Sequence, residues 1–244
     1  MEKFVVAIDG PAGSGKSSIS ALIAEKKGFT HIDTGAMYRA VTLEALNRKI
    51  NLEDENEYDF VNKINVSYEK GKTLLNGKDV SKEIRTEEVT NNASLVAKYK
   101  IVRDRMVEFQ RQSASLGKVI MDGRDIGSIV LPNADLKIFL TAKAEERARR
   151  RCKENAEKGI ESDFETILKE IKIRDYKDSH REIAPLKVCK DAVIVDTTNM
   201  TIDEVVNHIS NLIDERYKKM TTKESSFEEL LNSLNLKQYD LVIL

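Results

Sequence analysis

The eight residues at positions 10–17 constrain the fold more than any other stretch of the chain. They read Gly-Pro-Ala-Gly-Ser-Gly-Lys-Ser and match the spacing G-x-x-x-x-G-K-S in full. The glycines let the backbone curl so that its N–H groups point at phosphate oxygens, Lys16 reaches the outer phosphates, and the Ser17 hydroxyl is placed to ligate Mg²⁺. An apolar run at residues 4–9 precedes the loop and a helical pattern follows from Ile19. This context predicts a strand, a phosphate-binding loop and a helix.

The spacing of apolar residues in the rest of the chain indicates an α/β protein. Short apolar strands are expected at residues 4–9, 29–33, 119–122, 136–140 and 193–196. Because helical patterns separate them, they predict a five-stranded parallel sheet with helices on both faces. The core of this α/β domain would comprise residues 1–50 and 114–220.

A small insert is expected at about residues 51–113. Apolar and polar residues alternate at 64–68, and Asn76-Gly77 is typical of a hairpin turn, so the insert should be antiparallel at first. One long helix is then predicted from Val89 through Phe109, ending near Gly117.

The sequence pattern of the C-terminal third predicts a lid, a last helix and a tail. Two helical patterns flank Gly159, which could act as the hinge of a lid at about residues 150–180. Thr201 and Glu204 form a capping box that starts the last helix. In the tail, residues 221–244, the stretch 225–228 could cap a separate short helix. Packing of the tail on its own domain and docking to another protein are both compatible with the sequence.

Composition excludes several classes of protein. Lys and Arg number 40 against 41 Asp and Glu, so the chain lacks the basic excess of a general binder of nucleic acids or membrane surfaces. Cys152 and Cys189 have neither metal-ligand spacing nor the density of a disulfide scaffold, which fits a reducing compartment. No stretch approaches the length of a membrane span. We therefore expect a soluble, cytoplasmic monomer that binds no nucleic-acid polymer and no membrane.

Three groups of charged and polar residues lie where the predicted strands or helices end, which is where open α/β sheets bind ligands. They are Asp33, Thr34 and Arg39; Asp122, Arg124 and Asp125; and Arg174, Asp178 and Arg181. Taken alone, the first group is better explained as a helix cap with a surface arginine. The second could be a structural ion pair, but charges directly after a buried strand favour a functional site. Asp122 is in the usual place for a carboxylate that holds Mg²⁺ or its water ligands.

The other candidates give weaker patterns. The face of the helix that leads to Arg174 begins apolar and ends charged, which indicates a cleft, although a helix leaving the core would look the same. The arginines 147, 149, 150 and 151 alternate with glutamates, so a solvated helix explains most of them, with one or two facing the phosphates. His31, His180 and His208 show no convergent pattern, and we assign them no role.

Taken together, these motifs resemble those of the bacterial cytidylate kinase family, which are nucleoside monophosphate kinases. The resemblance covers about residues 4–217. The motifs are residues 8–17; Asp33-Thr34-Gly35-Ala36-Met37-Tyr38-Arg39-Ala40; Asp122-Gly123-Arg124-Asp125; and Arg174-Asp175 with Ala184-Pro185-Leu186. It implies a P-loop kinase fold over residues 1–220, with a monophosphate-binding insert and a lid that closes over ATP. It also implies reversible transfer of the ATP γ-phosphate to CMP or dCMP with Mg²⁺.

The resemblance also implies roles for individual residues. ATP would be bound by Gly10, Pro11, Ala12, Gly13, Ser14, Gly15, Lys16, Ser17 and Ser18, with Ser17 and Asp122 at the Mg²⁺. Lys16, Arg124, Arg181 and the lid residue Arg150 would be catalytic. The substrate-binding residues would be Ser94, Arg103 and Asp125 at the cytosine; Arg174 and Asp178 at the ribose; Arg39, Arg124 and Arg181 at the acceptor phosphate; and Asp33, Thr34, Tyr38 and Asp122 around them.

Two other functions stay open at this point. The same scaffold could phosphorylate a different phosphate or small-metabolite acceptor. Alternatively, ATP hydrolysis could drive a partner protein, in which case the tail is the candidate partner surface.

Overall fold

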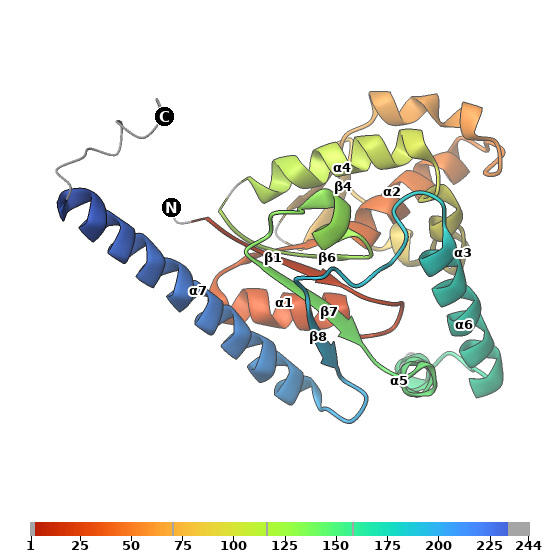
Figure 1. Ribbon diagram of the computed structural model, residues 1–244. Helices are drawn as coiled ribbons and strands as arrows, with labels where there is room; N and C mark the ends of the chain where they lie inside the picture. Colours follow the sequence, from red (N-terminus) through yellow and green to blue (C-terminus); the bar gives the residue numbers. More distant parts are fainter. Residues whose placement is uncertain (1–2, 70, 116, 158, 234–244) are drawn as a thin grey trace.

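The computed structural model describes residues 3–69, 71–115, 117–157 and 159–233. In that part of the chain a central sheet holds five parallel strands in the order β2-β6-β1-β7-β8, as predicted (Figure 1). The strands are β1 (Phe4–Asp9), β2 (Thr30–Asp33), β6 (Lys118–Gly123), β7 (Leu136–Thr141) and β8 (Val193–Asp196). All six residues of the central strand β1 are buried, which explains why that strand is apolar without alternation.

Helices cover both faces of this sheet. Because side chains alternate along a strand, Ile8 packs with α1 (Lys16–Lys27) and α7 (Ile202–Ser233), while Ala7 packs with α2 (Thr34–Asn47) on the opposite face. The helices α5 (Ala144–Glu157) and α6 (Phe164–His180) form a smaller apolar cluster of their own. The fold is therefore an α/β sandwich with a helical pair beside it (Figure 1).

The predicted antiparallel insert is present. It contains η1 (Glu55–Lys63), β3 (Val66–Glu69), β4 (Lys72–Leu75), β5 (Lys78–Asp79) and η2 (Glu83–Arg85). The three strands pair in the order β3-β4-β5. Asn76 and Gly77 have φ of 50° and 80°, as a tight hairpin turn requires. The apolar residues of the insert share the core of α2, so the insert is packed on the sheet domain.

The prediction of one long helix in the second half of the insert is wrong. The structure has two helices, α3 (Glu87–Val96) and α4 (Lys100–Ala114). Tyr99 between them is extended, with φ −73° and ψ 133°. Its ring centroid lies 4.9 Å from that of Tyr58, and its hydroxyl donates to the Leu52 carbonyl at 2.9 Å. These tertiary contacts break the helix, and the apolar spacing that continues across the break conceals it.

The last helix begins as predicted but ends later. Thr201 and Glu204 form the capping box, with the Thr201 N–H donating to Glu204 Oε2 at 2.8 Å and the Glu204 N–H to Thr201 Oγ1 at 3.3 Å. The prediction of a separate helix capped at 225–228 is wrong, because α7 runs unbroken to Ser233, with no glycine or proline in it to end the helix. The apolar residues 241–244 at the end of the sequence lie outside the described residues.

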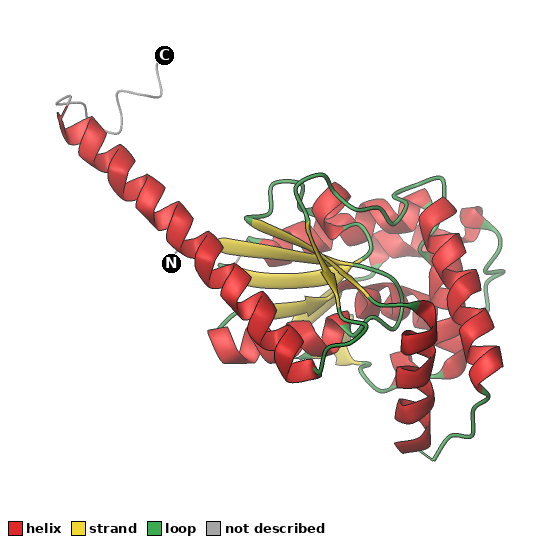
Figure 2. Cartoon of the chain, turned by 60° about the horizontal axis from the view of Figure 1, so that its bottom comes forward, coloured by secondary structure: helices red, strands yellow, loops and turns green. Residues whose placement is uncertain are grey.

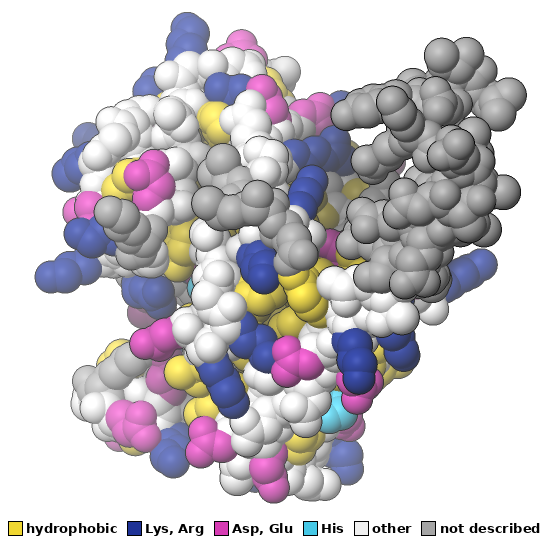
Figure 3. All heavy atoms as spheres, turned by 90° about the vertical axis from the view of Figure 1, so that its left-hand side faces the viewer, with side chains coloured by type: hydrophobic (Ala, Val, Ile, Leu, Met, Phe, Trp, Pro, Cys, Tyr) yellow, Lys and Arg dark blue, Asp and Glu magenta, His cyan; other side chains and the backbone are white. Residues whose placement is uncertain are grey.

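The end of α7 extends away from the sheet and its covering helices (Figure 2). Among the described helices, none has the length and apolar character needed to cross a membrane. On the face shown in Figure 3, the basic and acidic side chains of the described residues are interspersed, in agreement with a formal net charge of −1.

Candidate active site

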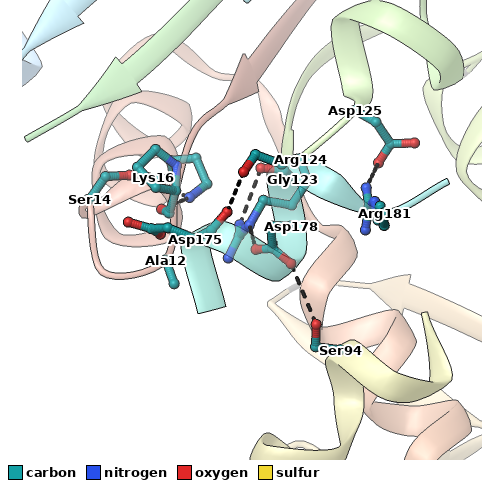
Figure 4. A network of polar contacts seen from close by, with 12 residues as sticks. Ala12, Ser14, Lys16, Ser94, Gly123, Arg124, Asp125, Asp175, Asp178 and Arg181 are labelled. Atoms are coloured by element: carbon teal, nitrogen blue, oxygen red, sulfur yellow. Dashed lines mark hydrogen bonds and ion pairs between the residues drawn. The ribbon is translucent and has the colours of Figure 1, made fainter. Parts of the chain in front are cut away.

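Lys16 is the first residue of α1, and its side chain folds back onto the loop that joins β1 to α1. It is only 5% exposed, and its ammonium donates to the Pro11 carbonyl at 2.7 Å and to Ser14 Oγ at 3.3 Å (Figure 4). Burial, with the nearby Arg124 guanidinium, lowers the pKa of Lys16 well below its usual value. A buried ammonium surrounded by backbone dipoles would gain much from an anion, so the loop is suited to bind phosphate.

Ser17 and Asp122 meet beside the loop. The Ser17 hydroxyl donates to Asp122 Oδ2 at 2.7 Å, because Asp122 in β6 lies beside Ile8 in β1. A hydroxyl and a carboxylate are oxygen ligands of the kind Mg²⁺ prefers. Among the described residues no cluster of three or more His, Cys, Asp or Glu could hold a metal alone, so phosphate oxygens and water would have to complete the coordination.

His31, which shows no convergent pattern in the sequence, contacts the other oxygen of this carboxylate. Its Nε2 lies 2.6 Å from Asp122 Oδ1, and the Thr34 hydroxyl donates to the Asp122 carbonyl at 2.7 Å. The parallel pairing of β2 with β6 creates this contact, which no local pattern reveals. Asp122 is therefore oriented from three sides.

A buried ion pair lies further along the same edge of the sheet. Arg103 of α4 donates to the Asp125 carboxylate and, at 3.2 Å, to the Ala97 carbonyl. Arg181 Nη2 lies 3.5 Å from Asp125 Oδ1, and its side chain points toward Asp125 (Figure 4). The structure thus brings together the residues predicted at the cytosine, Arg103 and Asp125, with an arginine predicted at the acceptor phosphate.

Asp178 of α6 contacts two further residues predicted to bind the acceptor nucleotide, Arg124 and Ser94. It accepts from Arg124 Nε at 2.8 Å and from the Ser94 hydroxyl at 3.4 Å (Figure 4). Burial would raise the pKa of Asp178, but Arg124, together with Arg174 and Arg181, holds this pKa below its usual value. Arg174, one turn earlier, has a buried Nε without a partner among the described residues, and burial lowers its pKa to about 10. Ser94 therefore contacts the predicted ribose residue instead of the predicted base residues.

Two residues of the first predicted group pair with each other. Asp33 caps α2 by accepting from the Ala36 N–H at 2.9 Å, and its second oxygen accepts from Arg39 Nη2 at 3.1 Å. Nearby, the Tyr38 ring lies 5.6 Å from the Arg103 guanidinium, and burial raises the pKa of Tyr38 to about 12. Asp33 is thus the predicted helix cap, and the helix that it caps also carries Tyr38, which lies beside Arg103.

Comparison with known proteins identifies the family. The model of the cytidylate kinase family matches residues 6–215. The chain belongs to the cytidylate kinase family. It is 51% identical over 221 residues to a cytidylate kinase of Ligilactobacillus salivarius, covering 88% of this chain and 99% of that protein. It is 52% identical over 215 residues to one of Fusobacterium nucleatum, with 88% and 99% covered. The family match ends before the last turns of α7.

In this cytidylate kinase family member, Arg150 does not join the other predicted catalytic arginines. Its guanidinium donates to Thr197 Oγ1 at 3.0 Å and to the Thr197 carbonyl at 2.6 Å, which ties α5 to the end of β8. Arg147 contacts the loop instead. It is 5% exposed and donates to the Ala12 carbonyl at 2.9 Å and to both oxygens of Asp175.

The solvated-helix interpretation fits Arg149 and Arg151 but is wrong for Arg147. The small residues Ala144, Ala148 and Cys152, spaced four apart, mark the packed face of α5 and could have indicated that the adjacent Arg147 is buried.

Asp9 is a further residue that the sequence analysis did not single out. It ends β1, is 5% exposed, and accepts from the backbone N–H groups of Ile126 and Gly127, both at 2.8 Å. Burial raises the pKa of Asp9 to about 6, although the two hydrogen bonds oppose the shift. The two hydrogen bonds therefore offset part of the cost of burying this carboxylate.

This shift predicts a pH dependence of stability. Between an unfolded pKa of 3.8 and a folded pKa of about 6, the folded chain holds a proton that the unfolded chain releases. The contribution of Asp9 to the free energy of unfolding is thus largest at low pH and falls as the pH rises through 6. Relative to Asp9→Asn, which cannot titrate, the wild type should lose about 2 kcal/mol between about pH 4.5 and 7.5. Urea unfolding of both proteins across this range measures the difference, and a constant difference would contradict the prediction.

Proposed function

We propose that this chain transfers the γ-phosphate of ATP to CMP or dCMP, giving ADP and CDP or dCDP, with Mg²⁺ bound beside the ATP. The observation that carries the proposal is the position of two consecutive residues after β6. Arg124 lies near Lys16 of the phosphate loop, and Asp125 pairs with Arg103 of α4. One short segment thus borders both a donor site and an acceptor site.

On the donor side, the loop N–H groups and Lys16 hold the ATP phosphates. The oxygen atoms of Ser17 and Asp122 would hold Mg²⁺, which would supply positive charge to neutralise the ATP phosphates. Arg147 supports the loop from α5 through the Ala12 carbonyl. The chain itself therefore contributes positioning and charge, the main requirements of phosphoryl transfer.

On the acceptor side, a cytosine fits the hydrogen-bonding groups. The Asp125 carboxylate accepts from the exocyclic amine, and Arg103 donates to the ring nitrogen and carbonyl. Uracil has the opposite pattern at these positions and should be disfavoured. Ser94 donates to Asp178 in this structure, so a role at the base requires rotation of its side chain.

The remaining polar groups suit a ribose phosphate. The unpartnered Nε of Arg174 and the carboxylate of Asp178 can contact the sugar, while Arg39, Arg124 and Arg181 neutralise the phosphate. No general base is needed, because the attacking phosphate oxygen is already anionic near neutral pH. The insert at 51–113 would bind the monophosphate, and the lid at 150–180 would close over ATP. A monomeric, cytoplasmic enzyme stays a prediction.

The direct test is an assay of ADP release with CMP, dCMP, UMP or AMP as acceptor. CMP and dCMP should give the highest kcat/KM, and the absence of stimulation by CMP would refute the proposal. Asp125→Asn should lower the ratio of kcat/KM for CMP over UMP about tenfold, because an amide can donate to uracil where the carboxylate can only accept.

Asp135→Asn is the matched control for Asp125→Asn. Asp135 accepts from the Val5 N–H at 2.7 Å, at the opposite end of the sheet, so its substitution should leave the ratio unchanged. If Asp125→Asn also leaves the ratio unchanged, the base is not read by Asp125, and a different acceptor on the same scaffold is favoured.

A further inference from the structure

The short helical turn η3 (Ile126–Val130) is capped in an unusual way. The first N–H groups of a helical turn lack partners within it, and an aspartate immediately before the turn commonly accepts from them with its own side chain. Asp125 occupies that position here, but its carboxylate makes no capping hydrogen bond. The two N–H groups are instead satisfied by Asp9, from a strand more than a hundred residues earlier.

Because Asp9 takes the capping role, the carboxylate of Asp125 is free to bind other groups. Since Asp9 satisfies the N–H groups of Ile126 and Gly127, the Asp125 carboxylate can turn to Arg103 and Arg181. A Cβ added to Gly127 would lie 3.1 Å from Lys137 Cδ and 3.4 Å from Asp9 Oδ2, so Lys137 and Asp9 both pack against the start of η3.

The chemistry of Asp9 supports a role beyond packing. A buried carboxylate is unfavourable, as its raised pKa reflects. It nevertheless offers two acceptor oxygens, one for each N–H group, whereas an asparagine offers one acceptor oxygen and an N–H₂ group that would face the second N–H. Asp9 also directly precedes Gly10, the first residue of the phosphate loop. Its side chain therefore connects the donor loop to the segment that carries Asp125.

We propose that Asp9 is a positioning residue for acceptor recognition: it caps η3 in place of Asp125, so that the Asp125 carboxylate can recognise the acceptor base. This inference rests on the proposed function above. Without Asp9, the Asp125 carboxylate, which holds the N-cap position of η3, could turn back and accept from the N–H of Gly127. Its withdrawal would leave Arg103 without its partner and weaken discrimination between cytosine and uracil.

A double-mutant cycle tests this coupling. The wild type, Asp9→Asn, Asp125→Asn and the double variant are compared by kcat/KM for CMP and UMP and by KM for ATP. Asp9→Asn should lower the CMP-to-UMP ratio about fivefold, mainly through a higher KM for CMP. In the Asp125→Asn background the same change should leave the ratio within twofold, because the effect acts through Asp125. A merely structural role would reduce activity without this loss of additivity.

A control variant and separate outcomes distinguish failure of the Asp9 proposal from failure of the proposed function. Asp135→Asn also removes a carboxylate that accepts from a backbone N–H of β1, and it should not alter the ratio. An unchanged ratio in Asp9→Asn, or an equal fall in both backgrounds, overturns the proposal for Asp9 alone. An unchanged ratio in Asp125→Asn overturns base recognition by Asp125 and, with it, this inference. If thermal unfolding shows that Asp9→Asn does not fold, Asp9→Ser, with a single hydroxyl acceptor, replaces it in the cycle.

Discussion

Replacing Arg124 with alanine is expected to lower kcat for CMP phosphorylation at least about a hundredfold. Arg124 Nε donates to Asp178 at 2.8 Å and Nη1 to the Gly123 carbonyl at 3.3 Å, so the guanidinium is fixed before substrate arrives. It is also near enough to Lys16 to lower the pKa of that residue. A fixed positive charge between the donor and acceptor sites stabilises the negative charge of the phosphoryl group during its transfer. Alanine at this position removes that positive charge.

Two further variants separate this role from general effects. Arg48→Ala is the control. Arg48 also pairs with one carboxylate, that of Glu44, but it lies at the exposed end of α2, so its removal should leave kcat within twofold. Arg124→Lys keeps a charge but lacks the Nε that donates to Asp178, so kcat should be intermediate. A kcat for Arg124→Ala within about fivefold of the wild type, with the protein folded, would contradict a role for Arg124 in the transfer step.

The arrangement of the core could be predicted from the sequence because it depends on local patterns. Strands such as β1 are continuous apolar runs, helices such as α1 follow the 3.6-residue spacing, and the loop motif connects the two. Parallel strands then place their carboxyl ends at one edge, which is why the Asp122 and Arg124 segment could be placed near Lys16 before the structure was known.

The contacts that the sequence did not reveal are those between distant segments. Asp9 reads as the end of a strand, and only the pairing of β1 with β6 brings it to the N–H groups of Ile126 and Gly127. Arg147 is indistinguishable by residue type from its exposed neighbours, and its burial depends on how α5 packs against the loop. The break at Tyr99 likewise arises from tertiary contacts that outweigh helical periodicity.

Replacing Gly10 with alanine is expected to disrupt both the fold and ATP binding. A Cβ at this position would lie 2.0 Å from the Leu140 carbonyl oxygen, which belongs to the backbone of β7. No side-chain rotation can relieve a collision with backbone, so the loop must move relative to the strand. We expect the free energy of unfolding to fall by about 3 kcal/mol and the Tm to fall by about 6–12 °C. KM for ATP should rise at least about tenfold, because phosphate binding depends on the direction of the loop N–H groups.

Gly28→Ala is the matched control, because it separates collision from backbone strain. Gly28 ends α1 with φ of 69°, and an added Cβ there meets nothing within 4 Å. Alanine should therefore destabilise the fold by only about 1 kcal/mol, from the positive φ alone, and leave KM for ATP unchanged. Thermal unfolding and ATP titration of the two variants make the comparison. If Gly10→Ala is no more damaging than Gly28→Ala, the close approach to β7 does not fix the loop, and the direction of its N–H groups must be set within the loop itself.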